Sequence, residues 1–244
     1  LAGEPAVPHA LTAPRWGFQD ALFGGRPVAP RRPLGDMVMR GVLFKVAHPA
    51  EFHAQSAAEA AIALHPEVAP RAAEVRRVRV WTQEAAMRII DKPGPLHNAA
   101  DRDHCIRYVV AVCLLRGTLT AADYADAAAA DPRIDVLRAV TEVREDPRYS
   151  AGYLDPARRS VANAVQVEFA DGTATARVEV EYPLGHPRRR AEAMPGLRRK
   201  LAGALALRLP AAAQERVLAL ADDPPALAAT PVPDLVDLLV PAVR

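Results

Sequence analysis

Apolar residues alternate with polar ones in three stretches in the middle of the chain. Residues 75–81 set valines against arginines, with one slip in phase, which predicts a strand. Residues 164–169 and 175–182 alternate in the same way and are joined through the Asp-Gly pair at 171–172, which predicts a hairpin. Residues 42–46 form a short apolar run that is typical of a buried strand.

Helical spacing of apolar residues dominates elsewhere. Residues 101–115 have acidic residues in the first turn and Gly117 after the last, and so predict the strongest helix. Near the beginning, Thr12 predicts the N-cap of a helix that ends at Gly24, followed by a proline-rich linker over 26–33. Further helices are predicted at 54–64, 121–129, 134–140 and from 183 to the end, where Pro195, Pro210 and Pro224 mark breaks.

The order of these elements predicts an α+β fold class, with a mixed helix and strand domain flanked by helical pieces. We place the α+β domain at residues 35–187. The helical pieces are residues 1–34 and residues 188–244.

Composition excludes several classes of protein. The chain has 244 residues, with 31 Lys and Arg against 29 Asp and Glu, and this near balance does not indicate nucleic-acid binding. The longest apolar run, residues 109–115, is too short to span a membrane, and no signal peptide is recognisable at the start. Cys105 and Cys113 are too few for a disulfide framework, so we expect a reducing cytoplasm.

The seven histidines do not predict a metal site. No two of them are four residues apart on a predicted helix, which is the spacing that helical zinc sites often use. The chain also lacks a glycine-rich phosphate loop and a Gly-x-Ser-x-Gly turn. We therefore expect neither a metal nor a nucleotide cofactor.

Lys45, Glu51 and His53 form a first candidate cluster, where a predicted strand leads into a helix. A cation, an acid and a base within nine residues could transfer protons. The spacing fits equally well a structural arrangement in which Glu51 caps the helix.

A second candidate cluster comprises Asp101, Arg102, Asp103 and His104, at the start of the strongest predicted helix. Free backbone N–H groups and two basic side chains there could bind an anion. The alternative is structural, with Asp101 as N-cap and an ion pair between Asp103 and Arg107.

His186, Arg188 and Arg189 form a third candidate cluster, directly after the predicted hairpin. Guanidinium groups pair with carboxylates, so this segment could hold a polycarboxylate. A basic turn at the surface explains the same residues without a ligand.

These three clusters, with the segments between them, resemble the MmgE/PrpD family. The resemblance runs in order along nearly the whole chain, although family members are about twice as long, and so we expect this chain to be the C-terminal part of such a protein. It rests on residues 10–18 (ALTAPRWGF), 49–55 (PAEFHAQ), 88–96 (RIIDKPGPL), 100–105 (ADRDHC), 119–124 (LTAADY), 131–135 (DPRID) and 182–190 (YPLGHPRRR).

The resemblance implies a hydro-lyase without cofactor or metal, which removes water from 2-methylcitrate to give 2-methyl-cis-aconitate in propionate breakdown. It also implies that the α+β domain is a lid, that both chain ends join one all-helical domain, and that the enzyme is a homodimer. Neither nucleic acid nor membrane is expected as a partner; the substrate is a small tricarboxylate.

The resemblance and the chemistry of dehydration together suggest roles for the three clusters. Proton transfer is expected from Glu51, His53, Asp103 and His104. Binding of the substrate carboxylates is expected from Lys45, Arg102, His186, Arg188 and Arg189.

Other functions stay open. A decarboxylase of cis-aconitate in the same family handles a similar substrate, but in that branch a histidine follows Pro-Ala where this chain has Glu51. An aconitase-like activity and a fragment without a complete catalytic site are the remaining alternatives.

Overall fold

The computed structural model describes residues 9–29 and 41–240, and the chain divides into two units, Leu1–Val42 and Leu43–Arg244. In the first unit, α1 spans Phe18–Phe23 and ends at Gly24, which is left-handed with φ 58°. The predicted start at Thr12 is wrong, because residues before α1 form turns and Arg15 has a φ of 66° that no helix allows. Of the predicted linker, only residues 26–29 lie within the described part.

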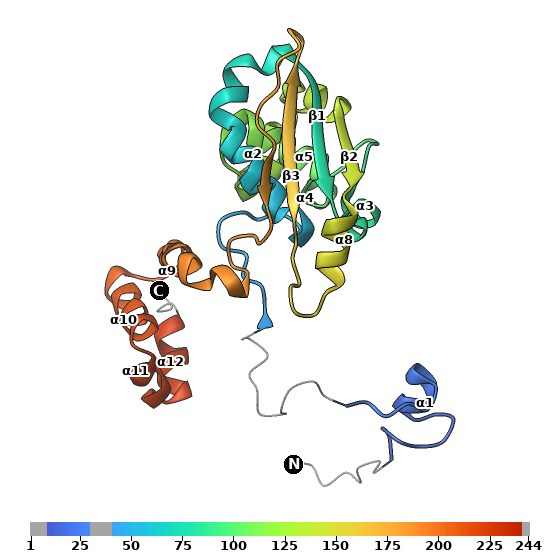
Figure 1. Ribbon diagram of the computed structural model, residues 1–244. Coiled ribbons are helices and arrows are strands. Elements are labelled where there is room, and N and C mark those ends of the chain that lie inside the picture. The colour runs from blue at the N-terminus through green and yellow to red at the C-terminus, as the bar shows by residue number, and fades with distance from the viewer. Residues whose placement is uncertain (1–8, 30–40, 241–244) are drawn as a thin grey trace. The chain divides into compact units, whose positions relative to one another are not determined.

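The second unit contains one four-stranded mixed sheet with the order β2-β1-β3-β4 (Figure 1). Its first two strands pair in parallel and the other pairs are antiparallel. The predicted strand at 75–81 and the hairpin are confirmed, although β4 is short and β2 was not predicted. The strands are β1 Val75–Thr82, β2 Thr141–Glu145, β3 Asn163–Phe169 and β4 Val178–Val180.

The slip in phase of the first strand has a structural cause. Pairing between β1 and β3 shifts register between Val75 and Arg77, so one extra residue interrupts the alternation. Downstream of the shift, Val78 and Val80 are buried and Arg79 lies on the opposite face.

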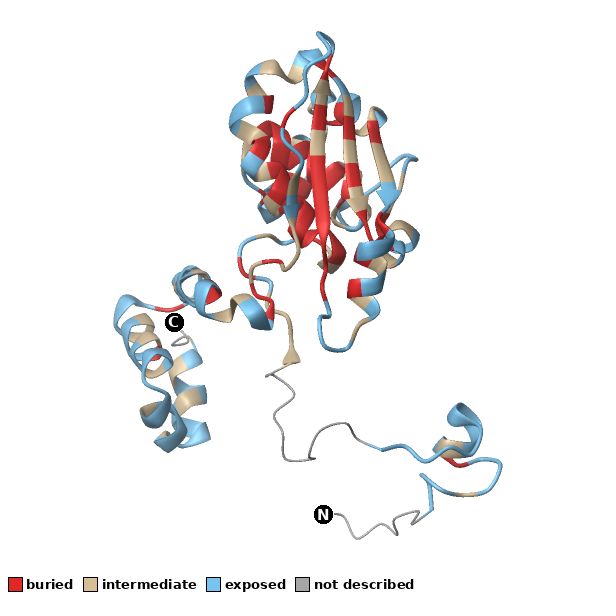
Figure 2. Cartoon of the chain, in the orientation of Figure 1, coloured by how far each residue is buried: buried red, intermediate tan, exposed pale blue. Residues whose placement is uncertain are grey.

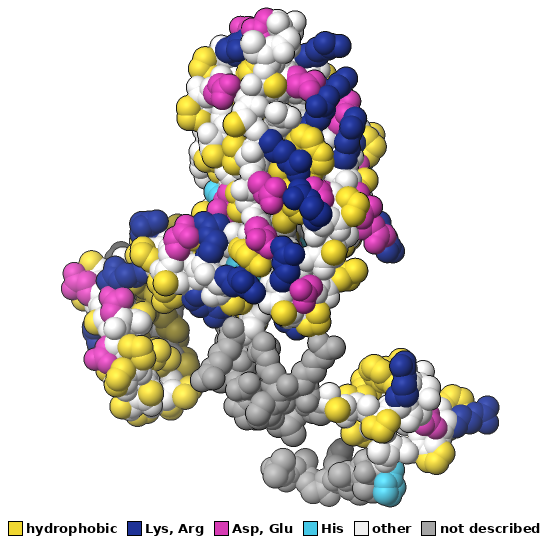
Figure 3. Space-filling model, in the orientation of Figure 1, with side chains coloured by type: hydrophobic (Ala, Val, Ile, Leu, Met, Phe, Trp, Pro, Cys, Tyr) yellow, Lys and Arg dark blue, Asp and Glu magenta, His cyan; other side chains and the backbone are white. Residues whose placement is uncertain are grey.

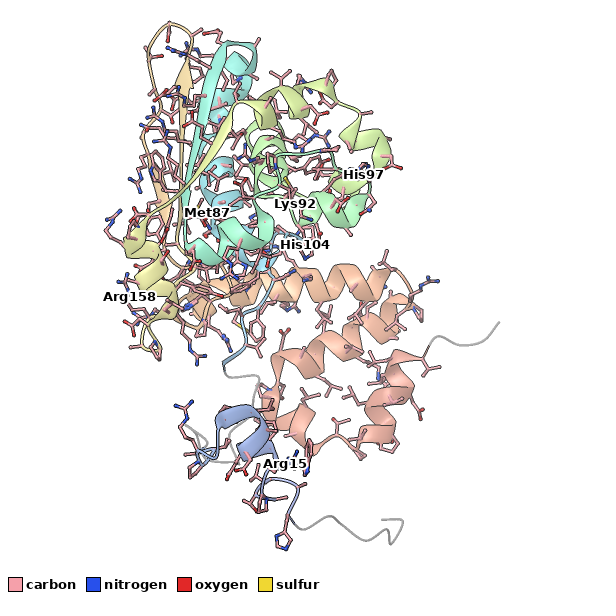
Figure 4. All side chains as sticks on the ribbon, turned by 90° about the vertical axis from the view of Figure 1, so that its right-hand side faces the viewer. Arg15, Met87, Lys92, His97, His104 and Arg158 are labelled. Carbon is pink, nitrogen blue, oxygen red and sulfur yellow. The ribbon has the colours of Figure 1, made fainter. Side chains whose placement is uncertain are left out.

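Helices α2, Gln55–Val68, and α5, Ile106–Arg116, cover one face of the sheet (Figures 1 and 4). Four alanines of α2 (Ala57, Ala58, Ala60 and Ala61) are fully buried and let α5 approach closely, so the valines and leucines of α5 complete the core. Figure 2 shows the buried residues gathered between the strands and these two helices. The predicted helix at 54–64 is confirmed.

The predicted helix at 101–115 is wrong as a single element. It consists of α4, Ala99–Asp103, and α5, separated at His104 and at Cys105, whose φ of −127° and ψ of 105° are extended. The acidic residues therefore belong to a short separate helix and not to the first turn of α5. Likewise, residues 121–129 divide at Ala125 into a 3₁₀ turn and α6.

The remaining helices and 3₁₀ turns between the strands are short. The helix predicted at 134–140 is confirmed as α7. The helices are α3 Glu84–Ile90, α6 Asp126–Ala129, α7 Pro132–Ala139 and α8 Pro147–Leu154, and the turns are η2 Phe52–Ala54, η3 Ala69–Glu74, η4 Ala121–Tyr124 and η5 Pro187–Arg189.

Residues 42–46 do not form the predicted strand. Phe44 N–H donates to the carbonyl of Gly185 over 3.2 Å, so this segment lies against a crossing loop and not in the sheet. Gly185 has a φ of 104°, and a Cβ atom on it would lie 2.0 Å from the Phe44 carbonyl oxygen. Close packing of two loops therefore explains the apolar run.

The chain ends in helices, as predicted. Pro210 and Pro224 stand at helix starts, but Pro195 lies inside α9, where the helix continues despite one missing backbone donor. None of the helices in the described residues is both long and apolar enough to cross a membrane. These helices are α9 Arg190–Ala206, α10 Ala211–Asp222, α11 Pro224–Ala229 and α12 Val232–Leu239.

The other face of the sheet is polar. Basic and acidic side chains intermix there (Figure 3), with Arg79 2.7 Å from Glu168 and Arg77 2.9 Å from Glu142. The α+β fold class is thus confirmed: helices cover one face of a small sheet, and paired charges cover much of the other.

Candidate active site

Glu51 and His53 are joined by hydrogen bonds at the entrance to α2. The Glu51 carboxylate accepts from the His53 backbone N–H over 2.8 Å and caps η2, and it also lies 2.9 Å from Nδ1 of the His53 ring. Burial raises the pKa of Glu51, but the bonds and charge of His53 outweigh it and hold that pKa below its usual value. Capping and acid–base pairing, the two alternatives for Glu51, therefore occur together.

The other ring nitrogen of His53 faces a residue that the sequence did not suggest. Nε2 lies 3.1 Å from the hydroxyl of Tyr153, which is half-buried near the end of α8. His53 itself is only 7% exposed, and its carbonyl accepts a hydrogen bond from Asn163 on β3. A buried imidazole is thus held between a carboxylate and a phenol.

Asp103 and His104 lie beside this group. Glu51 N–H donates to the Asp103 carbonyl over 3.1 Å, and the ring Nδ1 of His104 contacts the Asp103 carboxylate. A protonated His104 is close enough to lower the pKa of Glu51. We call Glu51, His53, Asp103, His104 and Tyr153 the acid–base cluster. The sequence suggested all of these residues except Tyr153.

Arg102 has structural partners. Its guanidinium donates to the Tyr124 carbonyl over 2.6 Å and lies 2.7 Å from the Asp126 carboxylate, with only 9% of the side chain exposed. The structural alternative for this segment is also wrong in detail. Asn98, not Asp101, caps α4, and Arg107 pairs with Asp91 instead of Asp103.

His186 caps η5 and has backbone partners at both ring nitrogens. Nδ1 accepts from the Arg188 N–H and Nε2 donates to the Arg159 carbonyl, both over 3.2 Å. Burial is the main cause that lowers the pKa of His186, so the ring is neutral at pH 7.

Arg188 and Arg189 differ in their surroundings. Arg188 is exposed, donates to the Ala157 carbonyl over 3.0 Å and lies over the ring of Tyr182. Arg189 is paired with Glu59 at 2.7 Å and with Glu192. We call His186, Arg188, Tyr182, Arg158 and Glu181 the arginine cluster, since Arg158 pairs with Glu181 beside it.

Lys45 lies on the loop that packs against Gly185. Its side chain is exposed, and its carbonyl accepts a hydrogen bond of 2.6 Å from Lys200 on α9. This contact joins the segment before the acid–base cluster to the first C-terminal helix.

The loop between α8 and β3 connects the two clusters. Tyr153 reaches His53, while the Ala157 carbonyl, four residues later, accepts from Arg188. Four residues span at most about 14 Å, so the backbones of Tyr153 and Ala157, each in contact with one cluster, lie within that distance. Figure 4 shows His104 and Arg158 both at the lower part of the sheet and its helices, on opposite sides of the view. All nine residues singled out from the sequence therefore belong to one unit, and seven lie in or directly beside these two clusters; Arg102 and Lys45 are held by other contacts.

Sequence reasoning gave no role in the site to four residues: Tyr153, Arg158, Glu181 and Tyr182. Tyr182 begins the segment 182–190 that carries the family resemblance, whereas Tyr153 and Arg158 stand in no local motif and reach the site on α8 and the loop that follows it. Arg158 also lines a surface hollow of ≈ 410 Å³ with Arg148 and Glu181.

The potential metal ligands and the two cysteines offer neither a metal site nor an accessible thiol within the residues that the structure describes. Residues 9–29 and 41–240 contain no group of three or more His, Cys, Asp or Glu side chains placed to hold a metal ion. Cys105 and Cys113 are both free and buried.

Comparison with known proteins identifies related sequences. Residues 48–223 match the family model for the MmgE/PrpD C-terminal domain. The chain is 52% identical over 239 residues to 2-methylcitrate dehydratase of Cupriavidus necator, which covers 97% of this chain and 49% of that protein. It is 49% identical over 241 residues to 2-methylcitrate dehydratase of Escherichia coli K12, covering 98% of this chain and 50% of that protein.

A eukaryotic relative is similar to the same extent. The mitochondrial 2-methylcitrate dehydratase of Yarrowia lipolytica is 50% identical over 220 residues, 89% of this chain and 42% of that protein. The chain thus spans about half the length of the curated relatives it matches.

Proposed function

Because this chain belongs to the MmgE/PrpD family, we propose that it supplies the acid–base half of an enzyme that dehydrates 2-methylcitrate to 2-methyl-cis-aconitate in propionate catabolism. The bacterial relatives named 2-methylcitrate dehydratase support the substrate and the hydro-lyase reaction. The observation that carries the proposal is the Glu51–His53 pair beside Asp103 and His104.

Dehydration breaks a C–H bond next to a carboxylate and a C–O bond, and forms a C=C bond. The reaction needs a base for the carbon-bound proton and an acid for the departing hydroxyl. In this proposal His53, supported by the Glu51 carboxylate, is part of the group that accepts the carbon-bound proton. His104, whose side chain is 48% exposed and contacts Asp103, protonates the hydroxyl.

The substrate carries three carboxylates, which require cations close to the acid–base cluster. Arg188 and Lys45 have exposed side chains, and we propose that they provide these cations. Arg102, Arg189 and the neutral His186 are engaged in buried or backbone contacts, and we propose that they shape the site around these cations.

The wider organisation is also a proposal. We propose that residues 35–187 form a lid domain, that residues 1–34 and 188–244 belong to a helical domain, and that the enzyme is a cytoplasmic homodimer without a cofactor. The free cysteines are consistent with a reducing compartment. Light scattering on the purified protein tests the dimer.

The direct test is an assay of the complete gene product that contains this chain. Incubation with 2-methylcitrate should produce a conjugated acid that absorbs in the ultraviolet, with the same rate in the presence of a chelator. Citrate and cis-aconitate are assayed beside it. Faster turnover of either acid than of 2-methylcitrate would overturn the proposed substrate.

A pair of variants tests the site. His53→Ala should lower kcat/KM by about 10²- to 10⁴-fold, the usual contribution of a positioned base. His97→Ala is the matched control, because His97 is exposed and lies outside both clusters. Equal activity of the two variants would remove His53 from the mechanism.

A further inference from the structure

We propose that Tyr153 is the group that takes the proton from the substrate, while His53 accepts the phenolic proton and Glu51 stabilises the resulting imidazolium. This inference rests on the proposed function. It names the residue of the proposed base that contacts the substrate directly. It is carried by the 3.1 Å contact between the Tyr153 hydroxyl and Nε2 of His53.

The partners of His53 determine which nitrogen is basic. A carboxylate only accepts hydrogen bonds, so Nδ1, at 2.9 and 3.2 Å from the two Glu51 oxygens, must carry a proton. In the neutral ring Nε2 then has a free lone pair, and the Tyr153 hydroxyl donates to it. The order carboxylate, imidazole, hydroxyl is the one that activates hydroxyl groups in other enzymes.

Accessibility assigns the terminal position to Tyr153. The His53 ring is buried and both of its nitrogens are occupied, so it offers no free atom to a substrate. Tyr153 is only half-buried, and no contact other than that with His53 is found for its hydroxyl within the described chain. The Tyr153 hydroxyl can therefore pass a proton from outside to Nε2 of His53.

The position of Tyr153 is set by the anchoring of α8. Tyr149, one turn earlier, is buried against Ala164 on β3 and against Ala162 just before that strand. At the other end, a Cβ atom on Gly152 would lie 2.7 Å from the Ser160 hydroxyl, so α8 approaches the following loop closely. These contacts hold the phenol next to His53 without any bond from Tyr153 itself.

The protons balance in one step. The C–H bond of the substrate breaks, its proton bonds to the Tyr153 oxygen, and the phenolic proton moves to Nε2 of His53. The electron pair of the C–H bond becomes the second bond of C=C as the hydroxyl leaves with a proton from the acid. The imidazolium returns its proton through Tyr153 to solvent, which also reprotonates the acid.

The test compares two phenylalanine variants of the same helix in the complete gene product. Tyr153→Phe should lower kcat/KM on 2-methylcitrate at least 100-fold, with little change in KM or in thermal unfolding. Tyr149→Phe, which loses a 3.0 Å bond from Arg177 and a bond with Glu179, should stay within about threefold of wild type. The variant with both Tyr153→Phe and His53→Ala should be no more than about tenfold slower than either single variant, because the two residues act as a unit.

A second readout separates chemistry from positioning. Replacement of Tyr153 by a fluorinated tyrosine, which is more acidic, should shift the alkaline part of the pH–rate profile to lower pH. Nitrogen NMR of His53 should show the same Nδ1-protonated ring in wild type and Tyr153→Phe, since Glu51 fixes it.

The outcomes are distinguishable. If the wild type dehydrates 2-methylcitrate and Tyr153→Phe keeps more than a fifth of the activity, the inference is wrong and the proposed function stands. An unchanged pH profile with fluorotyrosine would reduce Tyr153 to a positioning residue and overturn the inference. If the wild type acts on none of the acids tested, the proposed function fails, and the inference fails with it.

Discussion

Asp146 anchors the helix that carries Tyr153, and its removal should be measurable as lost stability. Its carboxylate caps α8 by accepting from the Arg148 N–H, pairs with the Arg148 guanidinium at 2.7 and 3.1 Å, and accepts from Arg177 at 3.2 Å. The hydrogen bond from Arg148 is the main cause that lowers the pKa of Asp146 from 3.8 to about 2.

This difference in pKa gives the size of the effect. At about 1.36 kcal/mol per pH unit, this difference corresponds to about 2.4 kcal/mol in the free energy of unfolding. Because the Arg148 side chain is 69% exposed, solvent screens the pair, and we expect about 1 to 2 kcal/mol. Asp146→Asn keeps a side chain that can cap the helix and removes only the charge.

The chain contains a matched control. Asp131 stands before Pro132 and Arg133 as Asp146 stands before Pro147 and Arg148, with Asp131–Arg133 bonds of 2.7 to 3.1 Å. The second arginine near Asp131, Arg116, lies 4.0 Å away, whereas Arg177 donates to Asp146 over 3.2 Å. Asp131→Asn should therefore cost less than Asp146→Asn.

The assay is urea unfolding of both variants at pH 7 and at pH 3. The folded-state pKa of Asp146 is depressed, so its contribution is complete above about pH 5 and decreases as the pH falls toward 2. About half of the difference between wild type and Asp146→Asn should remain at pH 3. An equal difference at both pH values would refute the electrostatic explanation.

Four further predictions concern other parts of the chain. Gly185→Ala should lower the free energy of unfolding by about 1 to 3 kcal/mol and more than Gly172→Ala in urea titrations, since only the former meets backbone. Ser56→Ala should cost about 1 to 3 kcal/mol in the same measurement, because it leaves a buried carbonyl and a buried amide without their partner. His186 should titrate below pH 6.5 in proton NMR, so stability attributable to it falls as the pH drops through 6.5. Cys113, whose thiol pKa is raised by burial, should react with a thiol reagent only when urea unfolds the protein.

Local patterns in the sequence were sufficient for much of the fold. The alternation of valine and arginine in β1, including its register shift, is visible in the sequence because side chains of a strand alternate between two faces. The Asp-Gly turn was sufficient to predict the hairpin, and the apolar spacing was sufficient to predict α2. The predictions of a strand at 42–46 and of one continuous helix at 101–115 were wrong. A buried loop has the same apolar pattern as a strand, and a broken helix has the same apolar pattern as a continuous one.

The candidate site depends both on local sequence and on tertiary packing. Glu51 and His53 are two residues apart, and their contact follows from local backbone geometry that a sequence can suggest. Tyr153 is 100 residues from His53 and carries no motif, so its position depends on the packing of α8 against the sheet. Local spacing determines which side chains of one segment share a face, whereas contacts between distant segments depend on how whole elements pack, and no short stretch of sequence contains that information.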